Sequence, residues 1–139
     1  MNDQDYTILG IDYGDARVGI ALAHNIAKLP HPLTTLSNND QLITTIAQII
    51  QEQNTKLIVL GLPLSASGNE TQQTQKVRQF CSQLSEQVPW PVVLVDESYS
   101  SVAVQERHGH AVVAKEAIDA QAAAVILERY FMEQKGEAQ

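Results

Sequence analysis

The sequence predicts an α/β fold: a mixed five-stranded sheet, three antiparallel plus two parallel strands, with helices on both faces. Three strand-like runs at 6–12, 17–24 and 31–36 are separated by short stretches that contain Gly, Asp or Pro. Two fully apolar runs, 57–60 and 92–95, each follow an amphipathic stretch with helical spacing. Strands joined by short turns pair antiparallel, whereas strands joined through helices pair parallel, so the predicted order is β-β-β-α-β-α-β-α.

The three helices are predicted from apolar residues that recur on one stripe. The first follows the capping segment "SNNDQ", and the second is closed by Pro89. The apolar positions are Leu42, Ile43, Ile46, Ile49 and Ile50 in the first helix, Val77, Phe80, Cys81, Leu84 and Val88 in the second, and Ile118, Ala122, Val125, Ile126 and Tyr130 in the last. The small residues at 120–125 favour close packing of the last helix on the sheet. The ribonuclease H-like fold has this order of elements.

Composition limits the possible classes of protein. The 139 residues are 44% hydrophobic and 18% charged, which is typical of one globular domain, expected to span 1–139. No apolar stretch approaches the ~20 residues of a membrane span, and the start "MNDQDY" lacks the pattern of a signal peptide. Cys81 is the only cysteine, so we expect a buried thiol and a cytoplasmic protein. The net charge of −7 disfavours non-specific coating of nucleic acid but allows a site that meets phosphate through metal ions.

Acidic residues stand at three expected ends of elements. Asp12 ends the first strand, Glu97 ends the last strand beside Asp96, and Asp119 opens the last helix. Open α/β sheets bind ligands at the carboxyl edge of their strands, where these residues would meet. Clustered carboxylates repel one another without a cation. Magnesium prefers oxygen ligands, and two such ions can clamp the attacking and leaving oxygens of a phosphodiester.

Each acidic residue also has a simpler interpretation. Asp12 could cap its turn through backbone hydrogen bonds, and Asp119 could favour the positive end of the helix. Asp96 and Glu97 could form a solvated strand end. The combination in this order of elements favours a metal site.

Two residues of the turn after Asp12 are candidates for binding substrate. Gly14 can adopt φ > 0 and leaves room for a phosphate backbone. Arg17 lies just beyond the turn and could reach a phosphate. An ordinary hairpin glycine and a surface strand charge are equally good interpretations.

Four segments, in order across almost the whole chain, resemble one family. They are "GIDYGDARVGIAL", "VLGLPLSASGNETQQTQKVRQF", "VDESYSSVAV" and "KEAIDAQAAAVILERYF". Together they resemble the YqgF or RuvX family of Holliday-junction-resolvase-like nucleases. The resemblance implies a ribonuclease H-like fold and a nuclease that uses Mg²⁺ or Mn²⁺.

The resemblance also implies a substrate and a set of site residues. The expected role is 5′-end maturation of the small-subunit (16S) rRNA precursor, with resolution of branched DNA as the older inference and ribosomal particles as further partners. The catalytic and metal-binding residues would be Asp12, Glu97 and Asp119, with Asp96 beside them. Ser98 departs from the family pattern, which usually has Arg after the Glu.

Two other classes of function stay open at this point. Sugar kinases, Hsp70-like chaperones and actin-like ATPases share a related opening hairpin, but they need two such domains to enclose ATP. A non-catalytic RNA-binding module of ribosome assembly could keep the same fold. Metal-dependent cleavage that is lost in Asp12→Asn would separate an enzyme from such a module.

Overall fold

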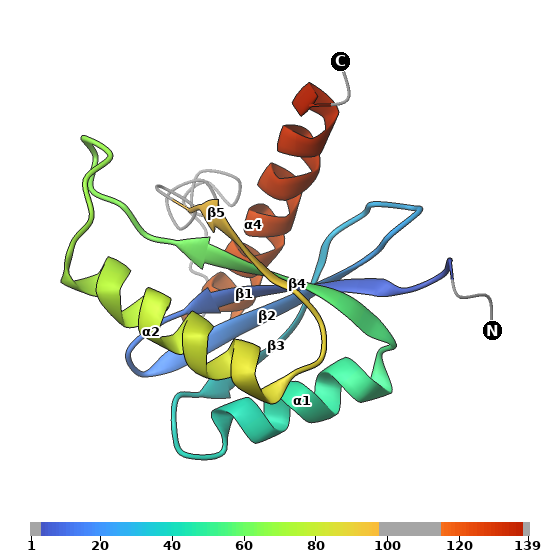
Figure 1. The fold of residues 1–139 in the computed structure, drawn as a ribbon, viewed down its shortest axis with the longest axis horizontal. Coiled ribbons are helices and arrows are strands. Elements are labelled where there is room, and N and C mark those ends of the chain that lie inside the picture. Colours follow the sequence, from blue (N-terminus) through green and yellow to red (C-terminus); the bar gives the residue numbers. More distant parts are fainter. Residues whose placement is uncertain (1–3, 98–114, 138–139) are drawn as a thin grey trace.

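The computed structural model describes residues 4–97 and 115–137, and its elements follow the predicted order. The elements are β1 (Thr7–Tyr13), β2 (Arg17–His24), β3 (His31–Ser37), α1 (Leu42–Glu52), β4 (Thr55–Leu62), α2 (Gln72–Gln87), β5 (Val92–Asp96) and α4 (Lys115–Glu137). The sheet has the strand order β3-β2-β1-β4-β5 (Figure 1). β1, β2 and β3 are antiparallel, whereas β4 and β5 run parallel to β1, so the predicted mixed sheet is confirmed.

Helices cover both faces of the sheet, also as predicted (Figure 1). α1 and α2 pack on one face over a core of large side chains, which include Leu9, Ile11, Leu60, Phe80 and Leu84. α4 packs on the opposite face over a second core that is rich in small side chains, which include Ala21, Ala23, Ala123 and Ala124. Alternate residues of the strands serve the two cores because successive side chains point to opposite faces.

The boundaries of several elements differ from the prediction by a few residues, and those of β1 and α4 change the place of Asp12 and Asp119. β1 continues past Asp12 to Tyr13, which pairs with Val18 and stacks its ring on Phe80 of α2 at a centroid distance of 4.3 Å. α4 begins at Lys115, because the residues before Asp119 are good helix formers. Asp119 therefore lies in the second turn of α4, where the helix dipole has little effect.

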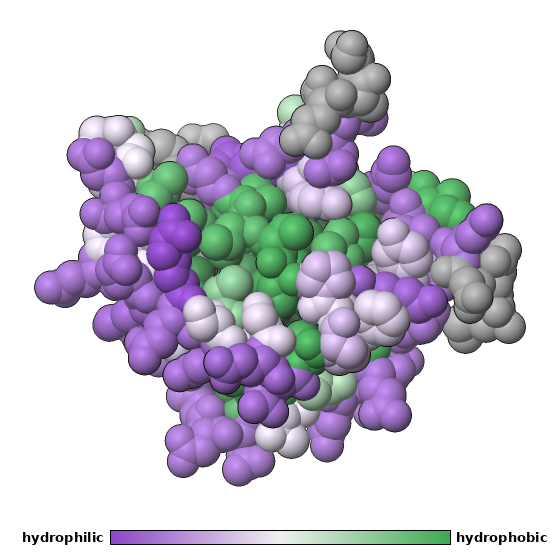
Figure 2. All heavy atoms as spheres, viewed as in Figure 1, coloured by the Kyte–Doolittle hydropathy of each residue, from purple (hydrophilic) through white to green (hydrophobic). Residues whose placement is uncertain are grey.

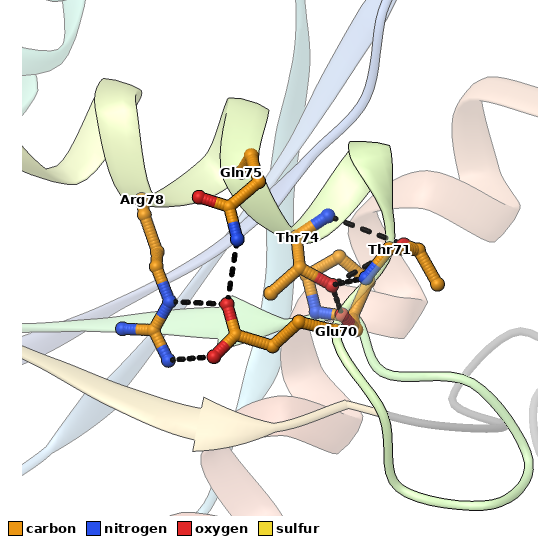
Figure 3. A network of polar contacts seen from close by, with 6 residues as sticks. Glu70, Thr71, Thr74, Gln75 and Arg78 are labelled. Carbon is orange, nitrogen blue, oxygen red and sulfur yellow. Dashed lines mark hydrogen bonds and ion pairs between the residues drawn. The ribbon is translucent and has the colours of Figure 1, made fainter.

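A capping box closes the N-terminus of α2, and a further hydrogen bond links it to the residue after β4 (Figure 3). The Thr71 hydroxyl accepts a hydrogen bond from the Thr74 backbone N–H at 3.3 Å, and the Thr74 hydroxyl accepts one from the Thr71 N–H at 2.9 Å. The Thr74 hydroxyl also donates to the Pro63 carbonyl. These bonds fix the turn that carries the chain from the carboxyl edge of the sheet into α2.

The face of the molecule drawn in Figure 2 is polar at its edges. Seen from the direction of Figure 1, apolar residues gather near the middle of the molecule and hydrophilic ones surround them (Figure 2). Leu94 of β5 is one of the exposed large apolar side chains, at 36% exposure. Cys81 is partly buried rather than fully buried, beside the core under α2. Within the described ranges, no helix combines the length and apolarity that a membrane span requires.

Candidate active site

Asp12 lies on β1, the central strand, and glycines flank it on both neighbouring strands. Asp12 pairs with Gly19 of β2, and Ile11 pairs with Leu60 of β4, which places Gly61 next to Asp12 one residue further on. Residues aligned across a sheet point to the same face, and Asp12 shares the α4 face with Gly10. The two glycines have no side chains, so the carboxyl group of Asp12 has room for neighbours.

Glu97 fills part of that room. Its backbone N–H donates to the Leu62 carbonyl at 3.2 Å, which continues the pairing of β5 with β4. Its carboxyl group lies against Gly61, where a Cβ atom would come within 2.8 Å of Glu97 Oε2. The Glu97 and Asp12 carboxyl groups are hydrogen-bonded to each other. The structure therefore brings together two predicted residues that are 85 positions apart in the sequence (97 − 12).

The contact between these carboxyl groups changes their protonation. Burial, the hydrogen bond with Asp12, and the charges of Asp12 and Asp96 raise the pKa of Glu97 to about 10. Burial also raises the pKa of Asp12, the hydrogen bond from Glu97 lowers it in part, and the charge of Asp119 raises it. At neutral pH the pair thus holds a proton, which we assign to Glu97, and Glu97 donates it to Asp12.

Asp119 reaches the same edge of the sheet from α4, but it contacts a different residue. Arg17 Nε donates to Asp119 Oδ2 at 2.6 Å, and the two side chains are 37% and 23% exposed. The charge of Asp119 nevertheless acts on Asp12. Asp12 thus pairs with Glu97, and Asp119 pairs with Arg17. Among residues 4–97 and 115–137, no three His, Cys, Asp or Glu side chains are gathered as a ready-made metal site.

The structure corrects the expectation that Gly14, in the turn after β1, adopts a positive φ. Gly14 does not adopt a positive φ, which among the described glycines only Gly68 does, at 85°. Gly14 instead is required for space, because a Cβ atom there would lie 2.6 Å from the Arg17 carbonyl oxygen. Asn38 Nδ2 donates to the Gly14 carbonyl at 2.7 Å and steadies the turn.

The remaining candidates lie beside the site or outside the described residues. Asp96 is exposed; its carbonyl accepts a hydrogen bond from Arg129 at 2.6 Å, and its charge raises the pKa of Glu97. Ser98, the position that departs from the family pattern, lies outside the described residues.

Sequence reasoning missed the residues that allow α4 to reach the site. At Gly19 a Cβ atom would lie 1.9 Å from the Asp119 carbonyl oxygen, and at Gly10 it would lie 2.8 Å from the Ala123 carbonyl oxygen. Both glycines stand inside apolar strands, which is the sequence signal of a close backbone approach. The small residues at 120–125 complete this contact, and the expected close packing is confirmed.

The donor set suits a hard divalent cation. Asp12, Glu97 and Asp119 offer carboxylate oxygens, and Mg²⁺ is commonly held by one or two carboxylates together with waters and substrate phosphates. Burial raises the pKa of both Asp12 and Glu97, so bringing their charged forms together is unfavourable unless a cation binds them. Asp12 and Glu97 therefore fit such an ion, and Asp119 is the third available ligand.

Comparison with known proteins identifies the family. The family described as "RuvX: Holliday junction resolvase" matches residues 6–133. The chain belongs to the RuvX family. This RuvX protein is 32% identical over 133 residues to a Burkholderia ambifaria protein named "Putative pre-16S rRNA nuclease", covering 91% of this chain and 89% of the relative. A Nitrosospira multiformis protein of the same name is 35% identical over 131 residues, covering 90% and 87%.

A solved structure confirms the predicted ribonuclease H-type fold. Thermus thermophilus RuvC, solved with a Holliday junction substrate, superposes with a TM-score of 0.58 and covers 92% of this chain and 96% of that one. The sequences are only 13% identical, so this likeness concerns the fold.

Proposed function

We propose that this RuvX protein is a divalent-metal-dependent nuclease that hydrolyses phosphodiester bonds during 5′-end maturation of the 16S rRNA precursor in the cytoplasm. The observation that carries the proposal is the contact between Asp12 and Glu97 at the carboxyl edge of the central strands, with Asp119 within electrostatic reach. Membership of the RuvX family and the names of the relatives support the nuclease activity and the RNA substrate.

In this proposal the three acids have a shared role. Asp12, Glu97 and Asp119 would hold Mg²⁺ or Mn²⁺, which supplies an activated water and stabilises the leaving oxygen. Glu97 must lose the proton that it donates to Asp12 before both carboxylates can act as ligands. Cys81 lies beside the core under α2, away from the acids, so it is not offered as a nucleophile.

The turn after β1 would receive the substrate backbone. Gly14 allows close approach because its α-carbon carries no side chain. Arg17 can bind phosphate through its guanidinium group, whose planar arrangement of donors matches phosphate oxygens. Gly14 lies two residues after Asp12, and Arg17 contacts Asp119, so the bound phosphate would lie beside the carboxylates.

The test is cleavage of the rRNA precursor by purified protein with Mg²⁺ or Mn²⁺. Asp12→Asn should lower the rate by at least about 100-fold, because the change preserves shape but removes a ligand charge. Asp15→Asn is the matched control: Asp15 is 66% exposed in the same turn and should retain activity. The products should carry 5′-phosphate and 3′-hydroxyl ends.

Other outcomes would contradict this assignment. Cleavage that persists in Asp12→Asn or in a chelator would exclude the metal mechanism, and cyclic-phosphate products would exclude it as well. Absence of cleavage combined with RNA binding would favour the non-catalytic assembly module. Cleavage of a four-way DNA junction in preference to the precursor would favour a junction resolvase.

A further inference from the structure

Arg17 and Asp119 form a short ion pair at the site. The Nε–Oδ2 distance is 2.6 Å, although the two residues are 102 positions apart in the sequence. Arg17 begins β2 and Asp119 lies in α4, so the pair joins the sheet to the helix that covers it. Both side chains are partly buried, so dissolved salt screens this ion pair less than it would screen a fully exposed pair.

The pair engages Asp119, the acid that stands apart from the hydrogen bond between Asp12 and Glu97. Asp12 and Glu97 are hydrogen-bonded to each other, whereas the Oδ2 atom of Asp119 accepts from a guanidinium. A divalent cation and a guanidinium compete for the same carboxylate, and their positive charges repel each other at short distance. Asp119 can therefore offer both of its carboxylate oxygens to a metal ion only when Arg17 moves aside.

We propose that Arg17 is a resident counter-ion of Asp119 that opposes metal loading and is released by it. Arg17 is thus a positioning residue with two states: paired with Asp119 before loading, and turned toward a substrate phosphate afterwards. This inference rests on the proposed function, because it concerns metal binding at the same three acids.

The geometry allows the change of partner. The Arg17 side chain is 37% exposed, so its guanidinium can leave Asp119 without crossing the core. The backbone of Asp119 need not move, since its carbonyl is packed against Gly19. The change of partner then consists of a rotation of the Arg17 side chain.

The experiment is a calorimetric titration of Mn²⁺ into wild-type protein, Arg17→Gln and Lys76→Gln. If the ion pair occupies Asp119 most of the time, its removal should tighten Mn²⁺ binding about fivefold. Lys76→Gln is the matched control, because Lys76 pairs with Asp15 in the same turn at 3.2 Å and does not contact Asp119. Its loss changes the net charge equally and should alter the affinity far less.

A second measurement follows the guanidinium directly. The Nε–H signal of Arg17 in a nitrogen–proton NMR spectrum, assigned by its loss in Arg17→Lys, should shift when Mg²⁺ is added. A persistent ion pair would leave the exchange of this proton with water unchanged at saturating Mg²⁺, whereas release of Arg17 should speed that exchange.

The outcomes separate this inference from the proposed function. Weaker or equal Mn²⁺ binding in Arg17→Gln, relative to Lys76→Gln, would overturn the counter-ion role while leaving the metal site intact. Absence of Mn²⁺ binding in wild type and in Arg17→Gln would overturn both the counter-ion role and the proposed function.

Discussion

The two faces of the sheet are built on different principles. On the α1 and α2 face, large side chains such as Leu60, Phe80 and Leu84 fill the space between helix and strands. On the α4 face, Gly10 and Gly19 allow the helix backbone to approach the strands so closely that a single added methyl group would clash. The acids occupy the second face.

This difference explains why the candidate site lies on the α4 face. On the α1 and α2 face, large side chains keep the helices at a distance from the sheet. On the α4 face, contact with glycines brings Asp119 of α4 beside the end of β1. Asp119 comes within electrostatic reach of Asp12 only because Gly19 admits the α4 backbone at that point. Close packing on the α4 face thus serves the site as well as stability.

Gly19→Ala should have the largest effect, because it adds volume where only backbone lies opposite. The new Cβ atom would meet the Asp119 carbonyl oxygen at 1.9 Å, so α4 must move and carry Asp119 with it. We expect a loss of about 4 kcal/mol in the free energy of unfolding, measured by urea denaturation, together with loss of cleavage. Gly68→Ala is the control: nothing lies within 4 Å of its Cβ position, so only its φ of 85° opposes the change.

Leu84→Ala should be nearly as costly but should spare the site. Leu84 is a fully buried residue of α2, and its truncation should cost about 3 kcal/mol in the free energy of unfolding. Mn²⁺ affinity per folded molecule should stay at the wild-type value, because the cavity opens on the other face. A matching loss of affinity would show that the two faces are coupled.

Glu97→Gln should change how stability depends on pH. Below its ordinary pKa of 4.5, Glu97 is protonated in both the folded and the unfolded state, so its contribution is fully present. As pH rises towards the folded pKa of about 10, only the unfolded state ionises readily, and stability falls. The Tm of metal-free wild type should therefore drop between about pH 5 and about pH 9.

Glu97→Gln should reduce this drop, because the amide can still donate to Asp12 but does not titrate. Asp12, whose pKa is also raised, acts in the same direction and leaves a smaller residual slope. Thermal melts in chelator across this pH range provide the measurement. Identical slopes in both proteins would show that the proton of the pair does not lie on Glu97.

Thr71→Ala should have the smallest effect of the four. It removes the hydroxyl that caps α2 and should cost about 1 kcal/mol in the free energy of unfolding. The neighbouring exposed pair Arg78–Glu70, at 2.9 Å, provides the comparison in Figure 3, and Arg78→Gln should leave the urea midpoint unchanged. An equal loss in both variants would show that the surface network, rather than the cap, holds this end of α2.

The local pattern was sufficient to predict the elements and their pairing. Alternating and helical apolar spacing predicted the strands and helices, and the connection lengths predicted the parallel and antiparallel pairs. The errors were local: β1 runs on to Tyr13 because its ring packs on Phe80, and α4 starts at Lys115. Neither packing partner nor helix start is visible from spacing alone.

The sequence by itself determined which residue types are available at the carboxyl edge of the sheet: Asp12, Glu97 and Asp119, with Arg17 near them. The tertiary structure decided how these residues pair, because each partner comes from an element distant in the chain. Glu97, which lies against Gly61, donates a hydrogen bond to Asp12. Arg17 forms an ion pair with Asp119, whose backbone lies against Gly19. Burial and the close packing of α4 on the glycines set these contacts, and both depend on the folded geometry rather than on the order of residues.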